Sequence, residues 1–144
     1  TTHHLDYNTR ERIGYYFNNG EIIDKENVLT SVQGSYITAT KDLLFKQNVV
    51  LVNKDYVIET DTLKHNTNSE TSFFFGPTVI TNKKNMLYTE NGWYNKKTNI
   101  GQFFENSYIN TESRFIYGNN LYYDGNTKIG IIHFLAFMVN TMHK

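Results

Sequence analysis

The chain repeats itself with a regular period. One series of side chains recurs each time the residue number rises by 29, and four of its five members are tyrosine: Tyr7, Tyr36, His65, Tyr94 and Tyr123. A second series follows phenylalanine at steps of 28, 30, 29 and 30, and its first four members open turns before short apolar stretches: Phe17, Phe45, Phe75, Phe104 and Phe134. A unit of strand, turn and strand this short cannot bury its own apolar face. Stacking on the copies before and after it must therefore stabilise it.

Alternate copies are more alike than adjacent ones. Two positions before the repeated Tyr or His, three copies carry leucine, namely Leu5, Leu63 and Leu121. The copies between them carry Gly34 and Gly92 at the same place. This alternation doubles the period to 58 and predicts two kinds of unit along the stack.

The composition favours β-strands. Aromatic residues make up 15% of the chain and alanine occurs only twice, so strand formers outnumber helix formers. Apolar and polar residues alternate at Val49 and Leu51 and again at Tyr56 and Ile58, and turn-forming clusters interrupt the pattern about every 8 to 12 residues. Only the segment 131–142 shows even a weak helical period. We predict an elongated all-β domain of about a dozen short antiparallel strands, stacked as 29- and 58-residue repeats.

The many aromatic side chains point to a ligand-binding groove or to a large core. Strand alternation predicts an inward face that includes Tyr15, Phe17, Leu51, Phe73, Phe75, Phe103, Phe115, Tyr117 and Tyr123. If the sheet stays open along one side, a groove lined by Phe and Tyr lies between its faces and suits an apolar ligand. Alternatively, the same rings fill a closed core, as aromatic side chains commonly do.

Charge and motif content exclude several classes of protein. Lys plus Arg and Asp plus Glu are equal in number at 14 each, so the basic surplus of a nucleic-acid-binding protein is missing. Cysteine is absent, and residues 1–8 show no secretory signal. The apolar runs are all much shorter than the stretch of about 20 residues that a membrane-spanning helix needs. The motifs HExxH, G-x-S-x-G and the phosphate-binding loop are also missing. We expect no enzyme activity, no catalytic residue, no metal site and no cofactor.

Two groups of charged residues have competing interpretations. Glu59 and Asp61 share one face of a strand and could supply the carboxylates of a glycosidase, although a solvated strand face explains them more simply. Two lysine doublets are candidate contacts for lipid phosphates at a groove rim, or else ordinary solvated turns: Lys83, Lys84, Lys96 and Lys97.

Several segments resemble a known family. The segments that carry the resemblance are 55–66, 75–80, 90–95 and 120–124. A pattern of a carboxylate or amide, one residue, Leu, one residue, an aromatic ring, and Asn or Asp recurs at 61–66 and 119–124. Together these segments resemble the OstA-like proteins of the LptA family of lipopolysaccharide-transport proteins, in the form seen in Bacteroidetes. The resemblance covers about residues 5–130 of a single domain, 1–144, which could belong to a longer protein, whereas the apolar end 131–144 diverges from the family pattern.

The resemblance implies both a fold and a function. The fold would be an elongated β-jellyroll of the β-taco type, and the location would be the periplasm. An apolar groove would shield the lipid A acyl chains of lipopolysaccharide on their way to the outer membrane. The partners would be other Lpt-type β-jellyroll proteins, or further copies in a head-to-tail oligomer, and exposed edge strands independently favour such pairing. The alternative is a structural or carbohydrate-binding β-solenoid without a lipid groove, with Trp93 and Tyr94 as stacking platforms for sugars.

Overall fold

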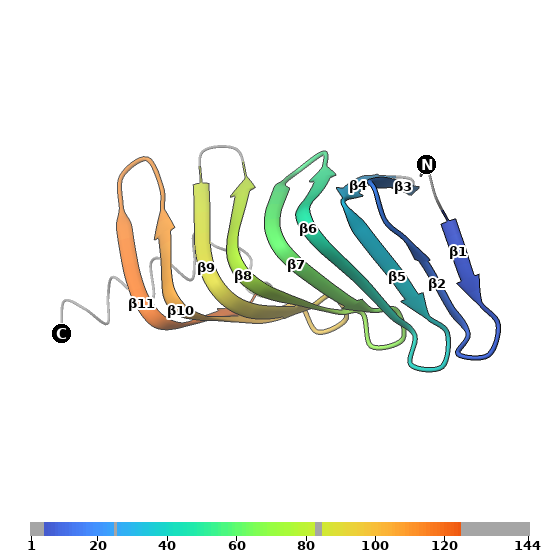
Figure 1. The fold of residues 1–144 in the computed structure, drawn as a ribbon. Helices are drawn as coiled ribbons and strands as arrows, with labels where there is room; N and C mark the ends of the chain where they lie inside the picture. Colours follow the sequence, from blue (N-terminus) through green and yellow to red (C-terminus); the bar gives the residue numbers. More distant parts are fainter. Residues whose placement is uncertain (1–4, 25, 83–84, 125–144) are drawn as a thin grey trace.

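The computed structural model describes residues 5–24, 26–82 and 85–124, and these form one open antiparallel β-sheet (Figure 1). Its strands are β1 (Leu5–Asn8), β2 (Ile13–Tyr16), β3 (Gly20–Asp24), β4 (Asn27–Ser31), β5 (Gln33–Ile37), β6 (Asp42–Asn53), β7 (Val57–Asn66), β8 (Thr71–Asn82), β9 (Asn85–Asn95), β10 (Ile100–Asn110) and β11 (Phe115–Asp124). They pair in the order β1-β2-β5-β6-β7-β8-β9-β10-β11, and β4 pairs with both β3 and β6. The predicted all-β stack is confirmed. None of the described residues belongs to a helix that is long and apolar enough to cross a membrane.

Each long strand bends near its middle, which gives the sheet the shape of a trough (Figure 1). Shifts in pairing register mark the bends, as between Lys46 and Val49 in β6. Residues with positive φ occupy the bends on alternate strands: Asn18, Asn19, Gln47, Asn48, Gly76, Glu105 and Asn106. These positions recur with the same period of 29 as the tyrosine series. Because a bulge inserts extra residues and bends the strand, the repeat determines where the sheet folds.

The bends divide the sheet into two arms. Arm A consists of β1, β2, β5 and the segments 42–46, 62–66, 71–75, 91–95, 100–104 and 120–124. Arm B consists of β3, β4 and the segments 49–53, 57–60, 78–82, 85–89, 107–110 and 115–118. Successive side chains of a strand point to opposite faces, so each arm has a concave face inside the trough and a convex face outside it.

One row of residues in register lines the floor of the trough on arm A. This aromatic row consists of Tyr16, Gly34, Phe45, Leu63, Phe74, Gly92, Phe103 and Leu121. Gly34 makes room for Tyr16, because a Cβ atom at residue 34 would lie 2.4 Å from the ring carbon Cε1 of Tyr16. Gly92 does the same for Phe103, whose Cδ1 would lie 2.7 Å from an added Cβ. Along the aromatic row, glycine and leucine therefore alternate between the rings. A ring packs over each glycine, and rings pack against each leucine.

A row of buried hydroxyl groups lies beside the aromatic row at the start of arm B. Its members are Ser31, Thr60, Thr78, Thr89 and Ser107. The Oγ1 atoms of Thr60 and Thr78 are 2.7 Å apart, and Thr89 Oγ1 lies 2.8 Å from Ser107 Oγ. Thr78 also donates to the Gly76 carbonyl across the bend, at 2.9 Å. These bonds satisfy polar groups at the point where the bulges interrupt the backbone ladder.

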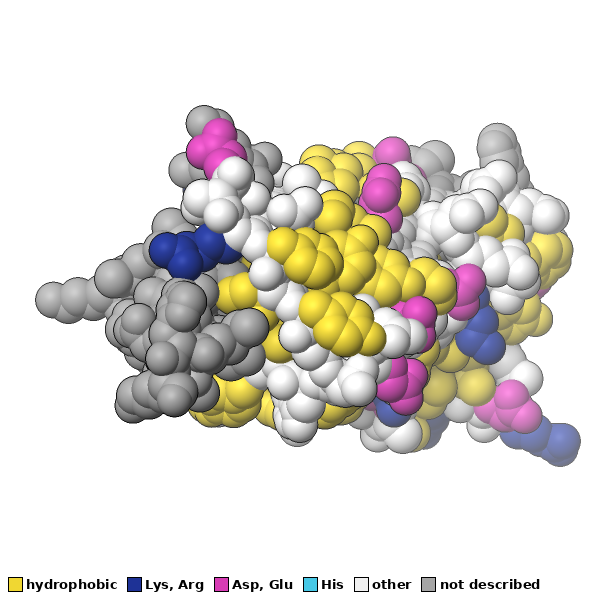
Figure 2. Space-filling view, turned by 90° about the vertical axis from the view of Figure 1, so that its left-hand side faces the viewer, with side chains coloured by type: hydrophobic (Ala, Val, Ile, Leu, Met, Phe, Trp, Pro, Cys, Tyr) yellow, Lys and Arg dark blue, Asp and Glu magenta, His cyan; other side chains and the backbone are white. Residues whose placement is uncertain are grey.

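The two ends of the described sheet differ in their surface. At one end, β1 closes arm A and β3 closes arm B, and β11 lies at the other end. Figure 2 looks onto the β11 end and shows hydrophobic side chains exposed over its middle. The exposed large apolar residues of β11 are Phe115, Tyr117 and Tyr122.

Candidate functional site

An aliphatic row runs along the whole length of the concave face of arm B, next to the hydroxyl row. This row crosses all strands of the arm in register and consists of Ile22, Leu29, Leu51, Ile58, Ile80, Leu87, Ile109 and Ile116. Most members of this aliphatic row are buried, and Leu51 and Ile80 are partly buried against them. A continuous apolar surface therefore forms one wall of the trough.

The concave face of arm A presents rings with polar tips. Its row, which we call the tyrosine row, consists of Gly14, Tyr36, Leu43, His65, Ser72, Tyr94, Gly101 and Tyr123. The ring centroids of Tyr94 and Tyr123 are 6.2 Å apart, and the Tyr94 hydroxyl donates to Asn99 Oδ1 at the rim. Such side chains place an apolar body in the trough and a polar group toward its opening.

Burial disfavours the charged forms of three side chains on the concave face of arm A. It raises the pKa of Tyr94, an effect that the nearby Tyr123 and Tyr56 increase, and it raises the pKa of Tyr123 beside Asp124. Burial lowers the pKa of His65, while Glu70 opposes this shift and Lys96 adds to it. The Nδ1 atom of His65 lies 2.9 Å from Ser72 Oγ, so a neutral imidazole has a hydrogen-bond partner there.

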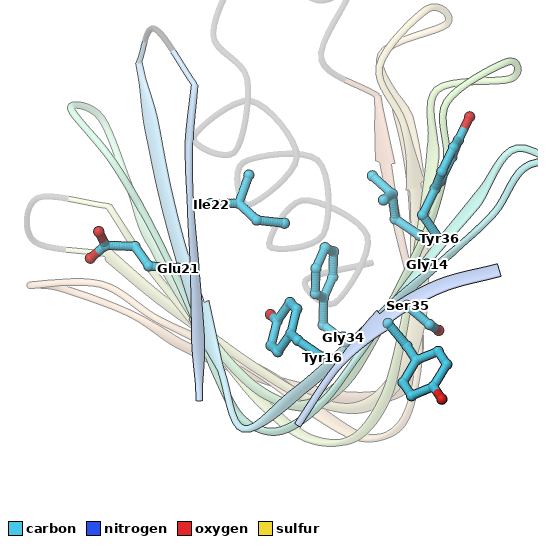
Figure 3. A pocket seen from close by; sticks show the side chains of 10 residues that line it. Gly14, Tyr16, Glu21, Ile22, Gly34, Ser35 and Tyr36 are labelled. Atoms are coloured by element: carbon cyan, nitrogen blue, oxygen red, sulfur yellow. The ribbon is translucent and has the colours of Figure 1, made fainter. Parts of the chain in front are cut away.

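A cavity of about 280 Å³ opens in the trough near the β1 and β3 end (Figure 3). Tyr16 and Ile22 point into it from the two arms, and Gly14 and Gly34 lie on its arm A side. Both glycines correspond to leucines one repeat later, Leu43 and Leu63. An added Cβ at Gly14 would make only ordinary contact, at 3.6 Å from Tyr7 Cδ2. The space beside Gly14 is therefore open where Leu43 carries a side chain one repeat later, whereas above Gly34 the ring of Tyr16 fills the place that the Leu63 side chain takes in the next copy.

Comparison with known proteins assigns the family. The family described as "OstA-like protein" matches residues 1–61 and again 61–143, which together span nearly the whole chain. The chain belongs to the OstA-like protein family. The predicted resemblance is therefore confirmed, and no curated protein matches the sequence.

The fold of this OstA-like chain is also found in a solved structure. It is similar to the crystal structure of LptH from Pseudomonas aeruginosa, described as the LptA-homologous periplasmic component of the conserved lipopolysaccharide transport device. The TM-score is 0.57 at 14% sequence identity, and the match covers 84% of this chain and 81% of LptH. At that identity the likeness concerns the fold, and the predicted β-jellyroll of the LptA type is confirmed.

The structure places the nine predicted groove residues on both faces of the sheet. Leu51, Phe103 and Tyr123 lie on the concave face in the three rows given above. Five of the others alternate with concave residues and belong to the convex side: Tyr15, Phe73, Phe75, Phe115 and Tyr117. Phe17 follows β2 outside the strands and is 40% exposed. Phe75, for example, is 42% exposed, whereas its neighbour Phe74 is 3% exposed. The predicted inward orientation is therefore wrong for the five convex residues, and for Phe17 it stays a prediction.

The error has a physical cause. A shift of one residue exchanges the two faces of a strand, and the bulges add residues at each bend, so alternation cannot be carried from one arm to the other. A signal for the correct residues is present in the sequence, because Tyr16, Phe45, Phe74 and Phe103 follow one another at steps of 29 without deviation. The phenylalanine series with steps of 28 and 30 mixes concave and convex positions.

The candidate phosphate contacts are only partly described. Lys83 and Lys84 lie outside the described residues. Lys96 and Lys97 lie in the turn between β9 and β10, at the tip of arm A. The Lys97 ammonium donates to the Asn68 carbonyl oxygen of the neighbouring turn, at 2.7 Å. Their contact with phosphate stays a prediction.

The charged strand residues form no compact site. Glu59 and Asp61 are both exposed, and Asp61 lies in a bend where its carboxylate accepts a hydrogen bond from Thr62 Oγ1. Within residues 5–24, 26–82 and 85–124, no three His, Asp or Glu side chains gather in a way that could hold a metal ion. The chemistry that the described trough offers is apolar contact, with hydrogen-bonding groups at its rim.

Proposed function

We propose that this OstA-like chain is a periplasmic lipopolysaccharide-transport module that holds lipid A acyl chains in its trough. The observation that carries the proposal is the pair of concave faces, where an unbroken aliphatic row lies opposite the tyrosine row, in which burial disfavours the charged forms of His65, Tyr94 and Tyr123. The open side leaves room for a bulky headgroup in water. Membership of the OstA-like family and the fold shared with LptH support the same function.

The energetics suit a carrier rather than an enzyme. Each methylene group transferred from water to the apolar trough contributes about 0.8 kcal/mol, so an acyl chain binds through many small equivalent contacts. Because the contacts along the aliphatic row are equivalent, an acyl chain can slide along it without being trapped in a deep free-energy minimum. Direction would then come from the partners at the two ends and from an energy source elsewhere.

The sheet ends are the proposed contacts with partners. Each terminal strand of the described sheet, β1 and β3 at one end and β11 at the other, has one edge that pairs with no other described strand. Backbone N–H and C=O groups of such an edge can add a strand from another β-jellyroll protein or from a second copy. Addition of this kind would continue both arms, so the trough of one module would open into the next.

A displacement experiment tests the proposal. An apolar fluorophore bound to the purified chain should be displaced by lipopolysaccharide but not by soluble glycans. Leu51→Asn on the concave face should weaken fluorophore binding, whereas Val52→Asn should not, because Val52 is 45% exposed on the convex face of the same strand. If lipopolysaccharide fails to displace the fluorophore from the folded wild-type chain, the proposal is wrong.

A further inference from the structure

The convex face of arm A carries an unusual surface over β8 to β11. Two rows in register combine rings with amides. Phe73, Trp93, Gln102 and Tyr122 form one row, and rings and amides alternate strictly in the other, Phe75, Asn91, Phe104 and Asn120. We call these eight residues the convex platform. All eight are uncharged, and Phe75 and Tyr122 are 42% and 50% exposed. The trough does not use any of them.

The platform's polar groups are arranged for hydrogen bonding along the surface. Gln102 Nε2 donates to Asn120 Oδ1 at 2.7 Å, which orients both amides. Nothing in the described part of the chain accepts from or donates to the side-chain amide of Asn91, which lies between Phe75 and Phe104. An amide offers two donors and an acceptor, and the rings offer flat faces with a negative potential.

The polar surface continues across the bend next to the platform. Tyr117 donates to Asn106 Oδ1 at 3.0 Å, and Asn106 Nδ2 donates to Glu90 Oε2 at 3.1 Å. The Tyr88 hydroxyl donates to the other oxygen of Glu90, at 3.2 Å, and its ring stacks on Tyr108 with centroids 5.0 Å apart. The convex face of β8 to β11 thus combines rings and hydrogen-bonding groups over both arms.

We propose that the convex platform binds saccharide of the kind that forms the polar portion of the amphiphile carried in the trough. A sugar ring presents C–H groups with a slight positive charge on its faces and hydroxyl groups at its edge. The C–H groups fit the aromatic faces, and the hydroxyl groups fit the interleaved amides. Two charged residues border the platform, Lys64 and Glu90. The Lys64 ammonium lies 5.8 Å from the centroid of the Phe73 ring, and both charged groups can hydrogen-bond to sugar hydroxyl groups. This inference rests on the proposed function, because it takes the cargo to be a glycolipid.

Trp93 makes the proposal directly measurable, since it is the single tryptophan of the chain and belongs to the platform. The probe is the acyl-free polysaccharide released from lipopolysaccharide by mild acid. We expect a saturable change in Trp93 fluorescence on titration. Phe75→Ala and Asn91→Ala should each weaken the binding about tenfold, and Val52→Ala, elsewhere on the convex surface, should leave it unchanged.

Several outcomes would overturn the inference. They are an absence of saturable change in the folded chain, equal affinity in all three variants, or a fluorescence change that follows protein concentration without polysaccharide, which would mark a surface for self-association. Because the polysaccharide has no acyl chains, fluorophore displacement from the trough by whole lipopolysaccharide is measured on the same samples. Displacement without polysaccharide binding refutes only the platform, whereas failure of displacement refutes the proposed function.

Discussion

Two neighbouring substitutions in β8 should lower the free energy of unfolding by very different amounts. They are Phe74→Ala and Phe75→Ala. Phe74 is 3% exposed and packs in the aromatic row between Leu63 and Gly92, while Phe75 is 42% exposed on the convex face. Truncation of a buried Phe to Ala costs about 3–5 kcal/mol, because transfer free energy is lost and a cavity remains. Truncation of the exposed ring should cost about 1 kcal/mol or less.

Equilibrium unfolding in urea measures the difference. At a slope of about 1–3 kcal/mol per molar urea, the Phe74 variant should unfold at a midpoint lower by about 1 M or more, with the slope unchanged. Phe74→Leu serves as the control, because it should lower the midpoint less and keep the variant folded. Equal losses for Phe74→Ala and Phe75→Ala, or a larger loss at Phe75, would refute the assignment of faces.

Three further predictions concern the aromatic, hydroxyl and tyrosine rows of the trough. Gly92→Ala should destabilise the fold by about 1–3 kcal/mol in urea unfolding, because the added Cβ would lie 2.7 Å from Cδ1 of Phe103 and 2.9 Å from the backbone carbonyl oxygen of Gln102; a neutral effect would contradict the close packing over Gly92. Thr78→Val should cost about 1–3 kcal/mol by thermal or urea unfolding, because it leaves the buried Thr60 hydroxyl without its partner at 2.7 Å; a neutral effect would contradict the role of the hydroxyl row. Because the pKa of His65 is lowered in the folded chain, the unfolded chain binds a proton at His65 more readily. The free energy of unfolding should therefore hold its full value above about pH 6.5 and decline as the pH falls below that value. His65→Phe should flatten that part of the pH profile, and an unchanged profile would show that another group is responsible.

The sequence predicts the fold well because the repeat and the fold have the same physical origin. Each repeat unit runs out along one bent strand and back along the next, so residues one repeat apart lie in one row of the sheet. The alternation of Gly34 and Leu63 is visible in the sequence, whereas its cause, the space needed by Tyr16 and Phe103, requires the structure. The turns between the strands recur with the same period, so their positions can also be predicted from the repeat.

The sequence does not predict which faces line the trough. Phe73, Phe74 and Phe75 are identical in chemistry, and only their pairing register separates the buried ring from the two convex ones. The bulges depend on pairs of residues with positive φ, such as Gln47 and Asn48, which carry no strong local signal for a bend. The convex platform escapes sequence reasoning for the same reason, because simple alternation assigns Phe73 and Phe75 to the interior.

Photo-crosslinking at Leu51 and Val52 is the measurement that decides whether the trough holds lipid. The two residues are adjacent and apolar, and they point to opposite faces of β6. A photoreactive side chain at residue 51 should crosslink to the acyl chains of lipopolysaccharide, and the same side chain at residue 52 should not. Equal crosslinking at both positions, or none at residue 51 in a folded sample, would contradict an acyl-chain site between the two arms.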